Sequence, residues 1–405
     1  MLDRLRRQAS VSPEQWALCV ALPFGQVSNM ALFVVLAVVR SDLSLSYSEL
    51  GLVLASFGIA RVLTDLPAGA LVQRFNPRTA LLVSLAGTLL AAVVGLSAAS
   101  AWQLAAARFI HGITSSVVQC AILVWLVGGA HSGRRGRVMA VSEGVFSVVG
   151  LTVPVAVGLL AAIMSWRAAF VLGIVAALAA FAATALWTDS ASAKAALGLE
   201  SADLETPKRL MSRLGSLRSG GAVLLSAYLI TIIIYFGRQS VIGTLLPLIG
   251  GDHVGLSSLR VGFALSLLNL VSIGAVMFGG WAGDRFGRGR LVVPGIVVLL
   301  VCQLSALLAH TEATFLLFAV MAGISFFMNS LPLTLVGDAL PGHLRADGVA
   351  VFRLIADVGV LLAPTVVGFT LDLGGFTAAE LVAPAATLAV LLAMLSLATA
   401  RAAGP

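Results

Sequence analysis

The chain alternates between long apolar stretches and short polar turns, with one longer polar segment near its middle. A helix needs roughly 20 apolar residues to cross the hydrocarbon core of a bilayer. Twelve stretches meet this requirement, at about residues 16–39, 47–71, 79–99, 102–128, 137–163, 168–187, 222–248, 259–281, 291–309, 313–336, 348–371 and 378–400. This pattern predicts an all-α membrane protein with twelve transmembrane helices.

A charged turn after the eighth stretch has a degraded copy in the first half of the chain. The turn reads Gly280-Trp-Ala-Gly-Asp-Arg-Phe-Gly-Arg288, and Gly69-Ala-Leu-Val-Gln-Arg-Phe-Asn-Pro77 begins 211 positions earlier. A proline and a glycine four residues later recur at an offset of 210: Pro154 and Gly158 match Pro364 and Gly368. Such repetition predicts two similar halves, a plan that occurs in transporters.

The longer polar segment divides the chain close to the midpoint of this repeat. Residues 188–220 mix small residues with both signs of charge, which is typical of a solvated linker. We therefore predict a six-helix bundle over residues 1–187, a cytosolic linker over 188–220 and a second six-helix bundle over 221–405.

Composition and charge narrow the class of protein. With 59% apolar and 11% charged residues, the chain is not a soluble domain. Its net charge of +7 would suit a nucleic-acid binder, but 18 of the 25 Lys and Arg residues fall on one side of the predicted membrane and three on the other. This asymmetry predicts that both termini are cytoplasmic in a multi-pass cell-membrane protein, such as one of a bacterial inner membrane. It gives no reason to expect a nucleic-acid partner.

The sequence offers no set of residues for an enzyme. It contains no phosphate-binding loop of the G-x-x-x-x-G-K-[ST] type, so ATP is not expected to drive it directly. Its three cysteines stand alone in apolar stretches, and we find neither a nucleophile with its base nor a metal-ligand cluster. We therefore expect no enzymatic activity, no cofactor and no metal, and uphill transport would need an ion gradient.

Several motifs together resemble the major facilitator superfamily, over nearly the whole chain. The turn at Gly280 matches the family's loop between helices 8 and 9, and Arg108-Phe-Ile-His-Gly112 matches its R-x-x-x-G pattern on helix 4. Trp166-Arg167-Ala-Ala-Phe170 is similar to the aromatic turn that enters helix 6. The resemblance implies two six-helix bundles around a central cavity lined by helices 1, 4, 7 and 10.

The resemblance also implies a cytosolic gate made by the two repeated loops. Its candidate residues are Gly280, Asp284, Arg285, Arg288, Gly69 and Arg74. The first loop departs from the family pattern, with Gln73 in place of the aspartate and Asn76-Pro77 in place of Gly-Arg, so the gate should depend mainly on the second loop. An ordinary positively charged turn would explain the arginines but not Asp284 or the glycines.

Ionisable side chains within the spans are the strongest pointers to function, because each costs roughly 2.5–3.5 kcal/mol at mid-depth. We predict that proton coupling, if present, runs through Glu143 or Asp357, with Arg353 as a neighbour. Arg353 and Asp357 are four residues apart, as are Arg61 and Asp65, so each pair can meet on one helix face. Such pairs can also serve only to reduce the cost of insertion.

Polar residues on the expected cavity helices are candidates for substrate binding: Asn29, Arg108, Tyr235, Arg238, Gln239 and Asn329. Amides often only bridge helices, so the two arginines, which lack a carboxylate one turn away, are the stronger candidates. A mixed apolar and polar cavity favours proton-coupled efflux of amphipathic small molecules, similar to the drug:proton antiporter branch. Two arginines also suit uptake or exchange of an organic anion. A non-transporting membrane scaffold or sensor is the alternative of another class. We expect a monomer.

Overall fold

The computed structural model describes residues 11–128, 135–200, 221–329, 331–341 and 344–402, and every regular element in these ranges is a helix. The first half contains α2 (Pro13–Phe24), α3 (Val27–Val34), α4 (Leu36–Asp42), α5 (Tyr47–Phe75), α6 (Pro77–Leu96), α7 (Ala101–Gly128), α8 (Arg135–Ile163), α9 (Ala168–Trp187) and α10 (Ser190–Glu200). The predicted first span is therefore broken, since α2, α3 and α4 follow one another with bends between them.

The second half repeats this plan with more interruptions. It contains α12 (Gly221–Ser240), η2 (Val241–Leu245), α13 (Leu246–Leu248), η3 (Ile249–His253), α14 (Ser258–Phe286), η4 (Arg288–Leu291), α15 (Val292–Leu304), η5 (Ser305–Leu308), α16 (Glu312–Ile324), η6 (Ser325–Met328), α17 (Leu331–Ala339) and α18 (Arg345–Ala402). The turns η2 and η3 are π-helical, so α12 widens directly after Ser240.

The number of membrane-length helices agrees with the prediction. The described residues contain 11 candidate spans, the last of which covers 48 residues from Asp347 to Met394. A straight helix of that length would measure about 70 Å, more than twice the roughly 30 Å of a bilayer core. The non-helical backbone of Gly375 (φ 71°, ψ −169°) divides it into two helices, which gives twelve spans.

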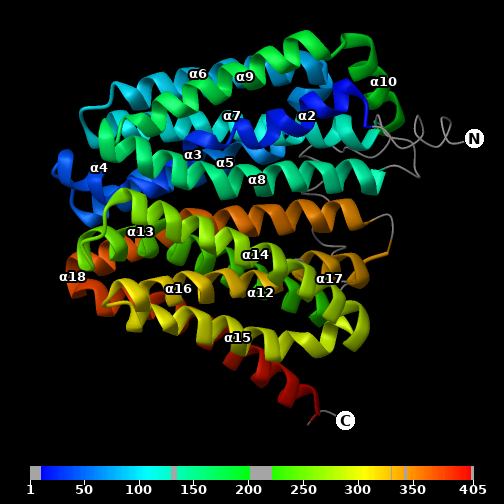
Figure 1. Cartoon of the computed structure of the whole chain (residues 1–405). Coiled ribbons are helices and arrows are strands. Elements are labelled where there is room, and N and C mark those ends of the chain that lie inside the picture. Colours follow the sequence, from blue (N-terminus) through cyan, green and yellow to red (C-terminus); the bar gives the residue numbers. More distant parts are fainter. Residues whose placement is uncertain (1–10, 129–134, 201–220, 330, 342–343, 403–405) are drawn as a thin grey trace, which may run out of the picture.

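The two halves lie side by side, with α2–α10 above and most of α12–α18 below in Figure 1. Both ends of the chain lie at the same end of the molecule, which we call the terminal end; the opposite end is the distal end. Residues 201–220 lie outside the described residues, so the predicted linker and the domain boundaries stay predictions. The first part of the predicted linker forms the helix α10, which packs on the first half. Ala193 and Ala196 of α10 are buried, and Asn76 donates a hydrogen bond to Ser190 O at 3.3 Å.

Glycines let the halves approach each other along two pairs of helices. A Cβ on Gly158 of α8 would lie 2.6 Å from Ser258 O of α14, and a Cβ on Gly368 of α18 would also collide with Tyr47 O of α5. Ser258 and Tyr47 begin their helices 211 positions apart, so the two contacts are equivalent. The repeated glycines of the sequence therefore lie at the interface between the halves, where a larger side chain would separate the helices.

A second pair of glycines shows that the repeat extends into each half. A Cβ on Gly112 of α7 would lie 2.6 Å from Phe57 O of α5, and a Cβ on Gly323 of α16 would lie 2.7 Å from Leu268 O of α14. Phe57 and Leu268 are 211 positions apart, as are Gly112 and Gly323, which is the offset of the sequence repeat. The halves thus share their internal helix packing as well as their order of helices.

The repeated loops keep one backbone conformation despite their different sequences. Asn76, which ends α5, has φ 71°, and Gly287, which ends α14, has φ 86°. Asparagine is one of the few side chains that tolerate a positive φ, because its short amide can bond locally. The departure Asn76-Pro77 therefore preserves the shape of the turn, and Pro77 begins the next helix at a position where no backbone N–H is needed.

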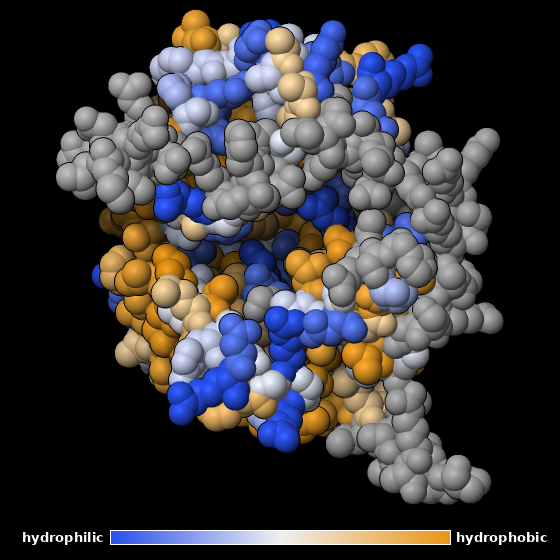
Figure 2. All heavy atoms as spheres, turned by 90° about the vertical axis from the view of Figure 1, so that its right-hand side faces the viewer, coloured by the Kyte–Doolittle hydropathy of each residue, from blue (hydrophilic) through white to orange (hydrophobic). Residues whose placement is uncertain are grey.

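Figure 2 shows a hollow between the two halves at the terminal end, with hydrophilic side chains on its walls. The glycine contacts described above lie toward the distal end, where α5 and α14 begin. The molecule is therefore joined at the distal end and hollowed at the terminal end.

Candidate functional site

The first membrane span breaks after α2, and α7 supplies hydrogen-bond partners for the break. Pro23 lies inside α2, and the helix ends at Gly25. The His111 Nε2 atom lies 2.9 Å from Gly25 O, and Gln26 donates a hydrogen bond to Ser115 Oγ at 2.8 Å. Broken helices inside membranes persist where neighbouring side chains satisfy the backbone groups that the break leaves without helical partners.

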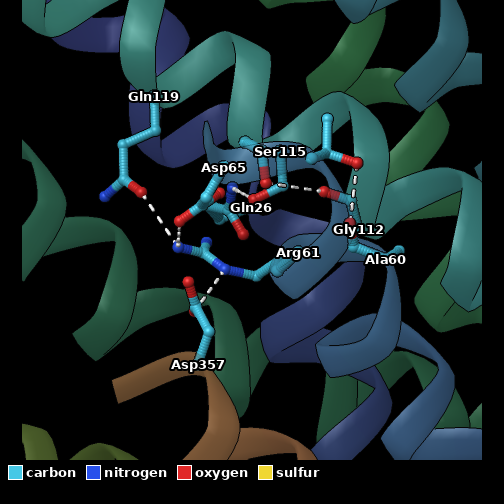
Figure 3. A network of polar contacts seen from close by, with 10 residues as sticks. Gln26, Ala60, Arg61, Asp65, Gly112, Ser115, Gln119 and Asp357 are labelled. Atoms are coloured by element: carbon cyan, nitrogen blue, oxygen red, sulfur yellow. Dashed lines mark hydrogen bonds and ion pairs between the residues drawn. The ribbon is translucent and has the colours of Figure 1, made fainter. Parts of the chain in front are cut away.

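A charged cluster joins the two halves near the middle of the bundle (Figure 3). The Arg61 guanidinium, on α5, lies 2.8 Å from Asp357 Oδ1 of α18 and 3.3 Å from Asp65 Oδ2 on its own helix. It also donates a hydrogen bond to Gln119 Oε1 of α7 at 3.3 Å. Asp357 is only 5% exposed, and its Oδ2 atom has no hydrogen-bond partner among the described residues.

The structure revises how the predicted coupling residues are paired. The expected Arg353–Asp357 pair is not formed among the described residues, because Asp357 turns to Arg61 of the other half. Glu143 is exposed rather than buried, and the described residues show no ion pair between it and Arg353. Of the predicted coupling residues, Asp357 is therefore the one that lies within a buried charged cluster.

Arg108 is buried against aromatic and amide groups instead of a carboxylate. Only 3% of it is exposed, its guanidinium donates a hydrogen bond to Asn29 Oδ1 at 2.6 Å, and it lies 4.6 Å from the centre of the Phe57 ring. Its Nε has no partner among the described residues. Two predicted substrate residues, Asn29 and Arg108, thus bind each other in this conformation.

Arg238 lines a small cavity in the second half. The guanidinium lies 4.5 Å from the centre of the Phe326 ring, and Asn329 and Gln303 share the same cavity. The cavity measures about 20 Å³, enough for a water molecule but not for a drug-sized ligand. Gln303 Nε2 and Asn329 Oδ1 are buried without hydrogen-bond partners in the described part of the chain, so polar atoms point toward this space.

The remaining amides and Tyr235 have mixed surroundings. Tyr235 packs edge-to-face on Phe352 with ring centres 6.0 Å apart, and Gln239 lies where α12 widens into η2. Asn269 bridges the halves structurally, because it donates a hydrogen bond to Gly150 O at 3.0 Å. The structure therefore brings Asn29 to Arg108 and Asn329 to the cavity beside Arg238, whereas Tyr235 and Gln239 do not line that cavity.

The distal end carries a polar lock that the sequence analysis did not identify. Arg40 Nε, on α4, lies 2.8 Å from Asp252 Oδ2 at the end of the seventh span. Asp372 accepts hydrogen bonds from the backbone N–H groups of Tyr47 at 3.1 Å and Ser48 at 2.8 Å, at the start of α5. The hydrogen bond with Asp252 raises the pKa of Arg40 above its usual value, whereas burial lowers it. Arg40 is therefore positively charged at any physiological pH.

The predicted gate loop binds its own half in this conformation. Arg288 donates hydrogen bonds to both carboxylate oxygens of Asp338, at 2.9 and 2.7 Å, and lies 4.0 Å from Asp284. The Asp284 side chain is 81% exposed. Among the described residues, neither Asp284 nor Arg288 forms an ion pair with the first half, so the expected clamp between halves is not made here. An open terminal end would separate its partners.

Some of these residues carried a signal that sequence reasoning can use. Arg40 and Asp252 both flank predicted spans, and charged residues at span ends are candidates for contacts between neighbouring helices. Their pairing depends on which ends meet, and that is a property of the three-dimensional arrangement. Gln303 had only the signal of an amide within an apolar stretch, which is common in membrane helices.

Comparison with known proteins gives a consistent result. A family model described as Major Facilitator Superfamily matches residues 18–281 and 227–404. The chain is 30% identical over 111 residues to the Na(+), Li(+), K(+)/H(+) antiporter of Planococcus maritimus, covering 25% of this chain and 26% of that protein. It is 27% identical over 146 residues to the staphylopine export protein of Staphylococcus aureus, covering 35% of each. These matches span a quarter to a third of the relatives' lengths.

The arrangement of helices is also similar to that of solved transporters. A bacterial homologue of the human lysosomal transporter Spinster, in an inward-facing and occupied conformation, superposes with a TM-score of 0.74 at 16% identity, over 96% of both chains. A POT family transporter in complex with a thioalcohol-conjugated peptide gives a TM-score of 0.76 at 11% identity, over 95% of both. At these identities the likeness concerns the fold.

Proposed function

The chain belongs to the major facilitator superfamily and is a membrane transporter, and on this premise we propose that it is a secondary active transporter that exports amphipathic small molecules in exchange for protons. The observation that carries the proposal is the cluster of Arg61, Asp65 and Asp357 between the halves. The cluster brings two carboxylates to one guanidinium, with the Gln119 amide bonded to that guanidinium and the charge of Arg353 also acting on Asp65. A proton on one carboxylate would reduce the repulsion between the two.

The position of Asp357 links this proton to the conformational change. Its carboxylate belongs to the second half and its partner Arg61 to the first, so their ion pair holds the halves together. A proton on Asp357 weakens this attachment and favours separation of α5 from α18. Entry of a proton from the distal side and its release at the terminal end would then accompany one alternation of the bundle.

The surroundings of the two arginines support an amphipathic substrate. Phe57 and Phe326 each pack on a guanidinium, and buried amide atoms lie beside Arg238. Aromatic walls with a few polar atoms suit a molecule that has both an apolar body and a polar group. The export and antiport activities of the relatives agree with this class of substrate and with ion coupling, although their matches cover only part of each chain.

Uptake or exchange of an organic anion is the second candidate, and one observation favours it. Neither Arg108 nor Arg238 forms an ion pair with a carboxylate among the described residues, and a guanidinium binds a carboxylate or phosphate with two parallel hydrogen bonds. A non-transporting scaffold is the alternative of another class. Arg108 argues against it, because a buried guanidinium without a carboxylate partner among the described residues is costly in a membrane and has no use in a static bundle.

The test uses purified protein in liposomes with ethidium as an amphipathic probe. An imposed pH gradient should drive ethidium accumulation, whereas exchange of ethidium without a gradient should need no net proton movement. Asp357→Asn should abolish gradient-driven accumulation and retain exchange. Glu312→Gln, which removes an exposed carboxylate paired with Arg260, is the matched control and should retain both.

Three outcomes decide between the candidates. Full gradient-driven transport by Asp357→Asn together with Glu143→Gln would place the coupling elsewhere or exclude the proton. Transport of a fluorescent organic anion but not of ethidium would favour the second candidate. Absence of exchange for both probes in the wild-type protein would support a scaffold or sensor.

A further inference from the structure

An apolar groove lies on the surface of the second half. It has a volume of about 580 Å³ and lies among α14, α15 and the turn η6. Every residue that lines it is apolar or glycine, with Phe278, Phe286, Leu291 and Phe327 as its largest walls. Nothing in the proposed transport cycle uses this groove.

The groove is open at the surface of the protein and runs along the length of a membrane-spanning helix. Phe278 is 57% exposed, and a Cβ on Gly274 would meet no atom within 4 Å. The lining residues of α14 run from Val271 to its last residue, Phe286, which corresponds to about 22 Å of helix. A groove of this length covers more than half of a bilayer core, and it begins at the terminal end of the molecule.

Cationic side chains lie next to the mouth of the groove. Arg285 precedes Phe286 in sequence and Arg290 precedes Leu291, and both arginines are exposed. Arg288, between them, is occupied by the two oxygens of Asp338. Arg285 and Arg290 form no such ion pair in the described part of the chain. With Asp284 also exposed beside Arg288, the mouth carries three arginines against two carboxylates and keeps a net positive charge.

We propose that this groove binds one anionic glycerophospholipid of the leaflet at the terminal end. Its phosphate lies between Arg285 and Arg290, and an acyl chain fills the groove along α14. The charge of the mouth complements the phosphate, and the apolar walls complement the chain. Basic clusters beside membrane helices attract anionic lipids in the leaflet that faces the cytosol, the side on which the charge asymmetry places this end.

Native mass spectrometry of the full-length protein tests the proposal. The protein is released from micelles that contain equal amounts of phosphatidylglycerol and phosphatidylcholine with the same acyl chains. Wild type should retain one phosphatidylglycerol in preference to phosphatidylcholine. The double variant Arg285→Gln/Arg290→Gln should reduce this preference about tenfold or more, because each arginine near the headgroup contributes to the selection.

Two further variants separate the groove from charge in general. Arg74→Gln removes the arginine equivalent to Arg285 in the first half and should leave the preference unchanged. Gly274→Phe should fill the groove and reduce retention of both lipids, whereas free glycerol phosphate should not displace the bound lipid. Gel filtration verifies that each variant is folded.

Equal retention of the two lipids by wild type would overturn the proposal. The proposal would also fail if Arg74→Gln reduced the preference as much as the double variant, since the effect would then reflect only the net charge of this end. Ethidium transport by the double variant is a separate measurement, so a failure of lipid binding and a failure of the proposed transport function are distinguishable.

Discussion

Arg61 and Asp357 come from different halves of the chain, and their Nε and Oδ1 atoms lie 2.8 Å apart. Each would be costly alone at this depth in a membrane, and each neutralises part of the other's charge. Because the two side chains separate when the halves separate, under the proposed function the pair would connect a protonation event to the movement of a whole bundle. The expected partner of Asp357, Arg353, lies on the same helix. A pair between these two residues would not connect the two halves.

The distal lock should control which end of the bundle opens. We expect Arg40→Gln to increase the population open at the distal end several-fold, because a partly exposed ion pair contributes up to about 1 kcal/mol. Double electron–electron resonance measures the change as distances between spin labels placed on the two halves at the distal end. Arg260→Gln, which breaks the exposed pair with Glu312 inside the second half, should leave the distances unaltered. Equal shifts in both variants would exclude a specific lock.

Close helix packing between the halves should depend on Gly262, whose Cβ would collide with Pro154 O. We expect Gly262→Val to destabilise the protein by about 1–3 kcal/mol, since overpacking moves the helices apart. Gly274→Ala lies on the same helix in open space and should be tolerated. Thermal unfolding in detergent compares the two variants, and similar melting temperatures would contradict this description of the interface.

The predicted gate loop should matter in the opposite conformation. We expect Asp284→Asn to impair cycling without preventing insertion, and to increase the population open at the terminal end, because a clamp removed on one side favours opening there. Asp338→Asn, which releases Arg288 from its present partner, should shift the population in the opposite direction. The same method measures distances between spin labels on the two halves at the terminal end. If both variants gave the wild-type distances, the clamp would be rejected.

The two arginines should discriminate between substrate classes. If the substrate is an organic anion, Arg108→Lys and Arg238→Lys should already weaken binding, because lysine lacks the planar pair of donors. For neutral or cationic substrates, we expect mild effects on affinity and a change mainly in the pH dependence of transport. Affinity and pH profiles of both variants answer the question. If both variants kept the wild-type affinity and pH profile, the two arginines would have only a structural role.

The orientation of the chain in the membrane is a prediction from the distribution of charge and can be tested chemically. In a protein whose native cysteines are replaced by alanine, Ser201→Cys in the predicted linker should react with impermeant thiol reagents only after the membrane is opened. Ala99→Cys, at the distal end, should react in intact cells. The reverse labelling pattern would invert the predicted topology.

The sequence alone determined the features that depend on local composition. Apolar stretches of sufficient length predict spans wherever they fold, and the repeat of glycines and prolines indicated two halves before any contact was known. The altered first loop, Asn76-Pro77, could also be recognised as a turn. Its shared shape with Gly287 became visible only from the positive φ of both residues.

The tertiary structure decided which distant residues meet. Asp357 had two arginines within reach in principle: Arg353 one turn away on its own helix and Arg61 almost three hundred positions earlier. Helix geometry alone favours the first, and the packing of α18 on α5 brings the second to 2.8 Å. The same reason applies to Arg40 with Asp252 and to the groove beside Arg285 and Arg290. Local sequence fixes a residue's chemistry and its helix, but the choice of partner is made by the docking of whole helices, whose energy is spread over many weak contacts.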